Sequence, residues 1–529
     1  MPVPVWSVDP RTGKPREQVA VEATAAEVDA AVTAAAAALP ALADRAARAR
    51  LLRTAADLLD GAADRLVSTA DAETALGAPR LTGELARTTF QLRFFADLVD
   101  EGAFLDVRID HADPHAVPAP RPDLRRYKVP IGVVAVYSAS NFPLAFSVPG
   151  GDTASALAAG CSVVVKAHPD HPATSELCAA LLRRAAAEAG LPEAVVSLVH
   201  GFRAGTDLVA HPLVAAAGFT GSVAGGRALH DAAAARPRPI PFHGELGSLN
   251  PVVVTAAAAA ERAEEIGTGL AASFTLGNGQ FCTKPGLVLV PAGDAGDRLV
   301  AALAGAVAEA PAGVLLDVRM RERFLAGVRE RAALPEVTAP VAPGPGGTDG
   351  APLTVRPGFL TVPAARLAAE GPHDLLTEEC FGPVTVVARY QDGPAGTAEV
   401  AAVLARLAGN LTATAHLSRA EAAGTGSAAE LLARLTPLAG RVLVNGWPTG
   451  VAVAPAQHHG GPYPATTSTS TSVGATAVER WLRPVVHQDT PPALLPPELR
   501  DDNPSALPRR VDGAFEQAPA RTAPPATSS

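Results

Sequence analysis

Residues 274–286 read Phe-Thr-Leu-Gly-Asn-Gly-Gln-Phe-Cys-Thr-Lys-Pro-Gly, and the chain can be interpreted outward from this stretch. It joins a helical pattern over residues 261–274 to a strand-like run over residues 287–291. Its three glycines permit backbone conformations that are closed to other residues and let a ligand approach closely. A thiol at Cys282 on such a loop can face a cleft and act as a nucleophile. The alternative is a small buried hydrophobe, the usual role of a free cysteine.

Four further motifs lie around this loop and carry a resemblance. Upstream are Ser-Asn-Phe-Pro-Leu at 140–144, Phe-Thr-Gly-Ser at 219–222 and Phe-His-Gly-Glu-Leu-Gly-Ser-Leu-Asn-Pro at 242–251; downstream is Glu-Glu-Cys-Phe-Gly-Pro-Val at 378–384. This ordered set resembles the aldehyde dehydrogenase superfamily over about residues 19–484. Residues 445–451 and 459–466 look like those of the α-ketoglutarate semialdehyde (2,5-dioxovalerate) dehydrogenase branch, which also includes a NADP-dependent fatty aldehyde dehydrogenase.

Length and composition set the outer bounds. A chain of 529 residues is too long for one core, so two or three domains are expected. Hydrophobic residues make up 48% and aromatic residues only 4%, which predicts cores of Ala, Val and Leu. The net charge of −9 argues against a nucleic-acid partner, which would need a basic face. An anionic substrate would then need a local basic patch.

The cysteines and the apolar runs indicate the compartment. Cys161, Cys178, Cys282 and Cys380 are widely spaced and contain no C-x-x-C pair, so neither a zinc site nor a disulfide framework is expected. This usage fits a reducing, cytoplasmic location. No signal peptide is evident, and no run of about 18 strongly apolar residues suggests a membrane span. Cys161 and Cys178 are expected in the core.

Strand-like and helix-like segments alternate through much of the chain. The β-branched run at residues 163–166 precedes a helix-like segment, and strands follow at 195–199 and 215–219. Such alternation predicts an α/β fold with a parallel doubly wound sheet, and a second series runs from residue 251 to about 444. Residues 335–352, rich in Pro and Gly, are expected to form an exposed loop.

The resemblance implies how these segments are assigned to domains. It gives two doubly wound parallel-sheet domains and a small β arm for assembly into a homodimer or homotetramer. The implied divisions are a cofactor domain at 1–242, with 114–130 contributing to the arm, and a catalytic domain at 243–445. Residues 446–484 form an oligomerisation segment and the return to the cofactor domain, and residues 485–529 are a C-terminal extension, disordered from about 514.

By resemblance, Cys282 is the catalytic nucleophile. A thiolate converts the aldehyde carbon into a tetrahedral adduct that can give up a hydride, and water hydrolyses the thioester that remains. Glu245 would be the general base, and partial desolvation would make it a better one; without the motif it reads as a surface loop residue. Asn141 would donate to the oxyanion together with the Cys282 backbone N–H, or else simply form a turn.

A glycine-rich turn at residues 221–226 is the candidate cofactor site. Lying between a strand and a helix, it could present backbone N–H groups to a phosphate. It lacks the G-x-G-x-x-G fingerprint, so alone it is a weak signal, and Ser222 could be an ordinary helix N-cap. The residues that the resemblance places at the cofactor here are Gly221, Ser222 and Gly226, with Glu379 and Phe381 at the nicotinamide ribose and ring; Glu378 is expected to face solvent.

The end of the strand at 163–166 bears on cofactor choice. Lys166 stands at the ligand edge of the sheet and, by resemblance, would bond the adenosine ribose, although a solvated lysine is the alternative. His168 follows, and Pro169 stands where NAD-preferring relatives often place a carboxylate. Arg203 could pair with a 2′-phosphate or be an ordinary surface arginine. These residues favour NADP, with NAD possible.

Competing functions remain open. Oxidation of α-ketoglutarate semialdehyde to 2-oxoglutarate leads, and a fatty or other aldehyde is the nearest alternative. A cofactor-independent thioester or ester hydrolase and a non-catalytic scaffold belong to other classes. No G-x-S-x-G motif supports a serine hydrolase. The adjacent His458 and His459 do not share a face and are interpreted as loop residues, so no metal is expected.

Overall fold

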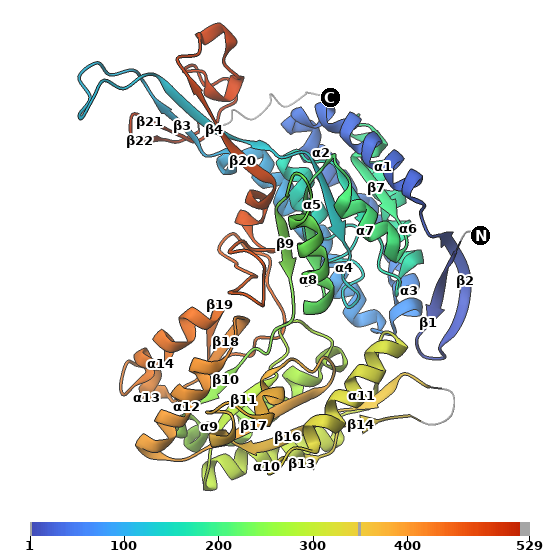
Figure 1. The fold of residues 1–529 in the computed structure, drawn as a ribbon, viewed down its shortest axis with the longest axis vertical. Coiled ribbons are helices and arrows are strands. Elements are labelled where there is room, and N and C mark those ends of the chain that lie inside the picture. Colours follow the sequence, from blue (N-terminus) through green and yellow to red (C-terminus); the bar gives the residue numbers. More distant parts are fainter. Residues whose placement is uncertain (1–2, 348–350, 519–529) are drawn as a thin grey trace, which may run out of the picture.

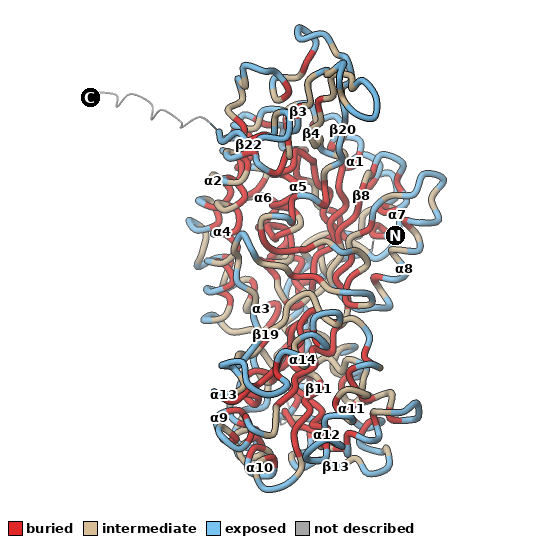
Figure 2. Tube along the Cα trace, turned by 90° about the vertical axis from the view of Figure 1, so that its left-hand side faces the viewer, coloured by how far each residue is buried: buried red, intermediate tan, exposed pale blue. Residues whose placement is uncertain are grey.

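The computed structural model describes residues 3–347 and 351–518. Two α/β halves follow one another along the chain, and a third, smaller sheet projects from the first half (Figure 1). Buried backbone runs through the sheets of both halves (Figure 2). The two doubly wound sheets and the β arm expected from the sequence are therefore present.

The first half is built on five parallel strands in the order β7-β6-β5-β8-β9. β5 and β6 are buried at every position, as a parallel sheet covered by helices on both faces requires. The strands are β5 (Val133–Tyr137), β6 (Val163–Lys166), β7 (Val196–Val199), β8 (Val214–Thr220) and β9 (Phe242–Glu245). The helices of this half are α1 (Ala25–Ala38), α2 (Arg45–Gly61), α3 (Ala63–Thr74), α4 (Ala78–Glu101), α5 (Gly151–Ala159), α6 (Pro172–Glu188), α7 (Phe202–Ala210) and α8 (Val223–Ala234).

Because of β9, the first half extends beyond the domain boundary that was expected at residue 242. The sequence placed the catalytic domain from residue 243, but β9 pairs with β8 and keeps Glu245 in the first sheet. Glu245 thus ends a strand and does not lie on a free turn. Lys166 ends β6, and the glycine-rich turn follows β8, so three candidate site elements share the carboxyl edge of this sheet, where ligands bind in open α/β folds.

The second half is built on seven strands in the order β13-β16-β17-β11-β10-β18-β19, parallel except for β13 against β16. The segment expected as a loop at 335–352 contains the edge strand β13, because Thr338–Val341 pairs with β16; residues 348–350 lie outside the described part. The strands are β10 (Val252–Val254), β11 (Leu287–Pro291), β13 (Thr338–Val341), β16 (Gly358–Pro363), β17 (Val384–Tyr390), β18 (Asn410–His416) and β19 (Ala439–Val444), and the helices are α9 (Ala256–Thr275), α10 (Asp294–Glu309), α11 (Val318–Ala332), α12 (Gly393–Arg406), α13 (Arg419–Ala422) and α14 (Ala428–Leu435).

The projecting sheet has five strands in the order β20-β4-β3-β21-β22. It uses more of the C-terminus than expected, because β21 pairs in parallel with β3 and antiparallel with β22. Disorder from about residue 514 is therefore wrong for Ala514–Glu516, and residues 519–529 lie outside the described part. The arm strands are β3 (Val107–Asp110), β4 (Leu124–Pro130), β20 (Leu482–Gln488), β21 (Arg509–Val511) and β22 (Ala514–Glu516).

Two small sheets complete the described residues. They are the hairpin of β1 (Pro4–Asp9) and β2 (Lys14–Val21), and the sheet of β12 (Gly313–Val314), β15 (Thr354–Arg356) and β14 (Gly344–Pro345).

One segment of the described chain, Ala25–Ala43, is long and apolar enough to cross a membrane by length and composition alone. It contains α1, whose Val28, Val32 and Ala35 belong to the hydrophobic cluster around the first sheet. A single segment of this kind is weak evidence for a span.

Candidate active site

The loop that carries Cys282 is fixed through its backbone carbonyls. It follows α9 and a short 3-10 turn at Leu276–Gly279. The Asn250 side-chain amide donates to the carbonyls of Cys282, at 2.8 Å, and Lys284, at 2.9 Å. Gly279 has φ +66°, and a Cβ there would collide with the backbone of Gly382, so the loop requires glycine at this point. The result is a rigid support for the thiol.

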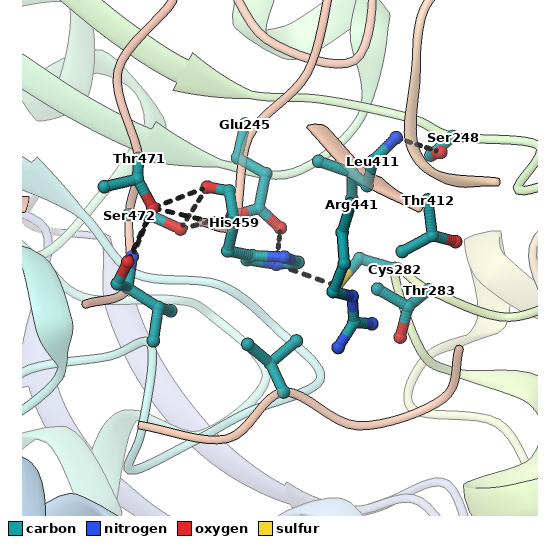
Figure 3. A network of polar contacts seen from close by, with 12 residues as sticks. Glu245, Ser248, Cys282, Thr283, Leu411, Thr412, Arg441, His459, Thr471 and Ser472 are labelled. Carbon is teal, nitrogen blue, oxygen red and sulfur yellow. Dashed lines mark hydrogen bonds and ion pairs between the residues drawn. The ribbon is translucent and has the colours of Figure 1, made fainter. Parts of the chain in front are cut away.

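Cys282, Glu245 and His459 converge at one point between the two halves (Figure 3). The His459 Nε2 atom lies 3.6 Å from the Cys282 sulfur and 2.9 Å from Glu245 Oε1. Ser472 donates its hydroxyl to the other Glu245 oxygen, Oε2, at 2.9 Å. The imidazole nitrogen therefore stands between the thiol and a carboxylate that is itself held in place.

The pKa of Glu245 is shifted in the direction opposite to the one that desolvation was expected to give. Burial raises the pKa of Glu245, but His459, Ser472 and Cys282 together lower it further, so the net shift is downward. Glu245 is a carboxylate at neutral pH and not the strengthened base that desolvation alone would give. Burial, followed by the charge of Glu245, holds the pKa of Cys282 well above its usual range.

Because its pKa is raised, the Cys282 thiol does not readily lose its proton to solvent. That loss would add a second negative charge beside Glu245 in a buried site. His459 Nε2 carries a hydrogen, which it donates to the Glu245 carboxylate, so it cannot take the thiol proton. Transfer of that proton to Glu245, whose oxygen lies within 4.8 Å of the sulfur, leaves the net charge of the cluster unchanged. The geometry thus favours an internal transfer as the route to the thiolate.

His459 is the principal site residue that sequence reasoning missed. It was interpreted as a loop residue, and it does lie outside helices and strands, but it is only 2% exposed. Its backbone N–H donates to the Thr471 hydroxyl at 2.7 Å, and its carbonyl accepts from the Ser472 N–H at 2.9 Å. The signal available in the sequence was the Ser/Thr-rich segment that follows this histidine and, in the structure, holds it in place.

The surrounding segment corrects a second expectation. Residues 446–484 were assigned to the oligomerisation sheet, but only the strand β20, which begins at Leu482, lies there. His459 and Ser472 belong instead to the active site.

The three ligand atoms of the cluster, from Glu245, Cys282 and His459, lie within 4.8 Å of one another, which is close enough to chelate a divalent cation. The absence of a metal role stays a prediction.

Asn141 lies next to the nucleophile loop. It is 8% exposed, and its side-chain Nδ2 donates to the Gln280 carbonyl at 2.9 Å. An amide nitrogen carries two hydrogens, so one remains for another acceptor. The structure therefore places Asn141 against the loop that carries Cys282, where it helps to hold that loop, and its role as an oxyanion donor stays a prediction.

The glycine-rich turn opens onto the space between the halves. Ser222 is exposed and caps α8, with its hydroxyl accepting from the Gly225 N–H at 3.2 Å, so the N-cap alternative holds for the described state. Gly221 is exposed as well, whereas Gly226 is buried against Leu246 and leaves no room for a side chain. The first turn of α8 presents free N–H groups suited to a phosphate.

Glu379 and the start of α8 both lie close to Gly247. A Cβ at Gly247 would lie 2.6 Å from Glu379 Oε2 and 3.1 Å from Val223 at the start of α8, so the absence of a side chain keeps a cradle open. Burial raises the pKa of Glu379 to about 7, which Lys284 opposes. Phe381 is half-buried beside it, and Glu378 is exposed, as expected. The contact of Glu379 and Phe381 with the nicotinamide ribose and ring stays a prediction.

The residues predicted to bind the adenosine end of the cofactor differ in burial. Lys166 is 9% exposed, burial lowers its pKa to about 8, and its Nζ lies 5.0 Å from the Phe202 ring centre. The Arg203 side chain is 84% exposed and is held by Asp207 at 3.7 Å. A further cation that the sequence did not indicate, Arg319, lies over the same Phe202 ring at 5.5 Å.

His168 and Asp170 complete this edge. Burial lowers the pKa of His168 well below its usual range, and its ring stacks on His171. Asp170 Oδ2 lies 3.4 Å from His168 Nδ1, with its side chain 7% exposed. Burial and then the charge of Asp317 raise the pKa of Asp170 to about 7. The carboxyl nearest to Lys166 in sequence is thus shielded and partly protonated.

Comparisons with known proteins match the chain to a family. A model of the aldehyde dehydrogenase family matches residues 4–462. "Alpha-ketoglutaric semialdehyde dehydrogenase 2" of Azospirillum brasilense is 48% identical over 479 residues, covering 89% of this chain and 88% of the relative. "Alpha-ketoglutaric semialdehyde dehydrogenase" of Acinetobacter baylyi is 43% identical over 471 residues, covering 89% and 87%.

A solved structure supports the fold as well. An E. coli NADP-dependent enzyme superposes with a TM-score of 0.75 at 25% identity, covering 92% of this chain and 94% of that one. Because a family model and curated relatives match along most of its length, the chain belongs to the aldehyde dehydrogenase family and is an oxidoreductase that acts on aldehydes with NAD(P).

Proposed function

We propose that this protein oxidises α-ketoglutarate semialdehyde to 2-oxoglutarate and prefers NADP. The names of the two curated relatives support the substrate. The observation that carries the chemistry is the buried cluster in which His459 Nε2 lies 3.6 Å from the Cys282 sulfur and 2.9 Å from Glu245. A thiol beside a base and a fixed carboxylate is the arrangement that covalent catalysis requires.

The residues divide the reaction into two stages. Cys282 gives its proton to Glu245, which His459 and Ser472 hold in place, and the thiolate forms a bond to the aldehyde carbon. Asn141 Nδ2 and the Cys282 backbone N–H stabilise the oxyanion of the adduct. The nicotinamide, when bound, supplies the hydride acceptor. Glu245 passes its proton on to solvent and then takes a proton from the water that attacks the thioester, so that the acid is released and the Cys282 thiolate leaves.

The formation of reduced cofactor tests this function. Purified protein is mixed with α-ketoglutarate semialdehyde or with a long-chain fatty aldehyde, with NADP or NAD, and absorbance at the reduced nicotinamide band is followed. The proposal predicts the highest kcat/KM for the semialdehyde with NADP. Higher efficiency with the fatty aldehyde would contradict the substrate. Ester or thioester hydrolysis without any reduced cofactor would point to the hydrolase alternative.

The preference for NADP rests on charge at the end of β6. The 2′-phosphate carries about two negative charges. Lys166, Arg203 and Arg319 offer cations around Phe202. Of the nearby acids, Asp170 is buried toward His168, Asp317 pairs with Arg319 at 3.5 Å, and Glu22 adds a negative charge near Lys166. The E. coli enzyme with a similar fold is itself named as NADP-dependent. NADP-dependent catalysis is therefore the better fit to this edge.

We predict that Lys166→Ala and Arg319→Ala each lower kcat/KM for NADP by about 10- to 100-fold, the effect of losing one hydrogen bond to a charged group, and affect NAD much less. NADPH fluorescence titration should show the same loss without turnover. Arg184→Ala, an exposed arginine paired with Glu188 on α6, serves as the control. Equal losses for both nucleotides, or a wild-type preference for NAD, would exclude this account.

We predict that His459→Gln shifts alkylation of Cys282 by iodoacetamide to higher pH, because Glu245 loses the imidazole N–H that holds its carboxylate beside the thiol. Steady-state turnover at pH 7 should fall by up to about 10²- to 10⁴-fold, the contribution of general acid–base catalysis, because the base is no longer held in place. His458→Gln is the matched control, since His458 is the adjacent, half-buried imidazole. An unchanged alkylation profile in the His459 variant would remove His459 from thiol activation.

We also propose that the projecting sheet joins two copies of the chain. β20 is an edge strand of that sheet, and its Val486 is 53% exposed. An exposed edge strand readily pairs with another strand. Light scattering of the wild type should report a dimer or tetramer, and Val486→Pro should lower that mass. A monomeric wild type would exclude the proposal.

A further inference from the structure

Two cavities adjoin the buried pair of Glu245 and His459. The front cavity, of about 260 Å³, is lined by Cys282 and His459 but not by Glu245 in the described structure. The rear cavity, of about 10 Å³, is lined by both Glu245 and His459 and has the volume that one water molecule needs. Figure 3 shows Ser472 to one side of the pair and Cys282 to the other. The carboxylate therefore has an exit that a substrate in front of Cys282 does not block.

The wall of the rear cavity is rich in hydroxyl groups and holds one imidazole. Side chains of the same face of a strand lie two positions apart, so His243 and Glu245 of β9 point to the same side. The strand thus brings an imidazole to the cavity that the carboxylate lines. The hydroxyl groups come from the segment after His459 and belong to Thr466, Ser468, Ser470, Thr471 and Ser472.

His243 has one ring nitrogen without a partner. Its Nδ1 lies 3.3 Å from the Ser468 hydroxyl and 3.2 Å from that of Ser470. Its Nε2 is shielded from solvent and has no hydrogen-bond partner among the described residues. Burial and then the charge of Arg480 lower the pKa of His243 to about 3, which the backbone of Arg480 opposes, so the ring is neutral at neutral pH. An unpaired buried ring nitrogen beside a cavity of this size indicates an ordered water.

Three other polar side chains of the rear cavity already have partners. Arg480 pairs with Asp152 at 2.7 Å. The hydroxyls of Thr466 and Thr471 donate to backbone carbonyls, each at 2.6 Å. The need for a further partner therefore lies with His243, and a water in the cavity meets it.

A line of serine hydroxyls leads away from Glu245. Ser472 donates to Glu245 Oε2 at 2.9 Å, and the hydroxyl oxygens of Ser468 and Ser470 lie 2.7 Å apart. Glu245 is only 4% exposed, whereas Ser468 and Ser470 are half-buried. Ser472 and Ser470 both line the rear cavity, so one water there can join the two ends of the line. The line then runs from the buried carboxylate toward solvent.

We propose that one water in the rear cavity, oriented by His243 Nε2, joins Ser472 to Ser470 and lets Glu245 pass its protons to solvent while substrate and cofactor fill the front. The proton of the Glu245 carboxyl moves to the Ser472 oxygen, and the Ser472 hydrogen moves to the water. A hydrogen of the water moves to Ser470, whose own hydrogen leaves through Ser468. Each group gains one proton and gives up another, and Glu245 becomes a carboxylate again. The inference rests on the proposed function through the role of Glu245 as base.

The kinetic test uses His243→Phe, which removes both nitrogens and keeps a ring to pack against Trp481, whose ring centre lies 5.3 Å away. With α-ketoglutarate semialdehyde and NADP, kcat should fall by about 10- to 100-fold, at or below the lower end of the contribution of acid–base catalysis, and each KM should stay within about 2-fold. The solvent deuterium isotope effect on kcat should increase. With a pH indicator in rapid mixing, proton release should lag behind the burst of reduced cofactor.

The controls separate positioning of the water from packing. His230→Phe is the matched control, because His230 is half-buried against Phe242 at 5.8 Å and lines neither cavity in the described structure. His243→Gln keeps an amide that can hold the water and should recover at least about a third of wild-type kcat. Ser470→Ala removes the next hydroxyl and should reproduce the lag; it carries the test if His243→Phe does not fold.

A crystal structure tests the water without turnover. The wild type should show a water within about 3 Å of both His243 Nε2 and Ser472 Oγ, and His243→Phe should lack it. A cavity without this water, or wild-type kcat and proton release in both His243→Phe and Ser470→Ala, would overturn the relay and leave the proposed reaction intact. The water, together with delayed proton release in the variants, in a protein that oxidises another aldehyde but not α-ketoglutarate semialdehyde would support the relay and overturn the named substrate.

Discussion

Cys282→Ala is expected to lower kcat for aldehyde oxidation by about 10⁴- to 10⁶-fold, the range found when a catalytic nucleophile is removed. No other described thiol can replace it, because Cys161 and Cys178 are buried in the core, and the half-buried Cys380 lies outside the cluster with Glu245 and His459. Without the covalent adduct the aldehyde carbon has no hydride to release. The measurement is steady-state formation of reduced cofactor with saturating aldehyde.

The same variant should keep its fold and its cofactor site. Cys282 supports the loop through its backbone carbonyl, which accepts from Asn250, and not through its sulfur. Thermal unfolding and NADPH binding should therefore match the wild type within experimental error. Residual turnover above about one per cent of wild type would rule out covalent catalysis at this position.

Glu245→Gln is expected to separate the two stages of the reaction. Removal of the Glu245 charge lowers the pKa of Cys282, so the thiolate can still form, and the first hydride transfer should proceed and give a burst of about one reduced cofactor per active site. Hydrolysis of the thioester should then fall by about 10²- to 10⁴-fold, because no carboxylate remains to take a proton from water. Rapid-mixing absorbance measures both phases.

The pH dependence of this variant gives an independent check. The charge of Glu245 helps to raise the pKa of Cys282, so its removal should lower that pKa and shift alkylation of the thiol to lower pH. Glu245→Asp is the control, since it keeps the charge while shortening the reach to His459. Steady-state turnover in Glu245→Gln equal to that of the wild type would assign the base to another group.

The parts of the site that could be predicted from sequence are those with local motifs. Cys282 stands in a glycine-rich loop, Glu245 stands between glycines before a strand, and Asn141 follows a buried strand. In each case the backbone requirement and the reactive group lie within a few residues, so the pattern indicates both. The alternation of β-branched runs with alanine-rich helices predicted the two parallel sheets for the same reason.

The parts that could not be predicted depend on contacts between distant segments. His459 meets Glu245 across 214 positions in the sequence, and its neighbours in the chain show only a polar loop. Arg87 of α4 lines one cavity together with Cys282, which follows it by nearly 200 residues, and in the sequence it looks like any other helix arginine.

The errors in the fold have a related cause. Ala514–Glu516 looked disordered because Pro, Ser and Thr dominate the residues after it, yet pairing with β21 orders it. The Pro- and Gly-rich composition of residues 335–352 likewise concealed β13, which is specified by its partner β16. Edge strands of this kind derive their order from a neighbouring strand more than from their own propensity.

The most direct test of the account is the mass of the Cys282 peptide during turnover. Glu245→Gln is mixed with NADP and α-ketoglutarate semialdehyde, quenched in acid within the burst, digested and examined by mass spectrometry. The account predicts a 2-oxoglutaryl thioester on Cys282 that appears only when oxidised cofactor is present and that disappears slowly. A full burst of reduced cofactor with an unmodified Cys282 peptide would contradict it.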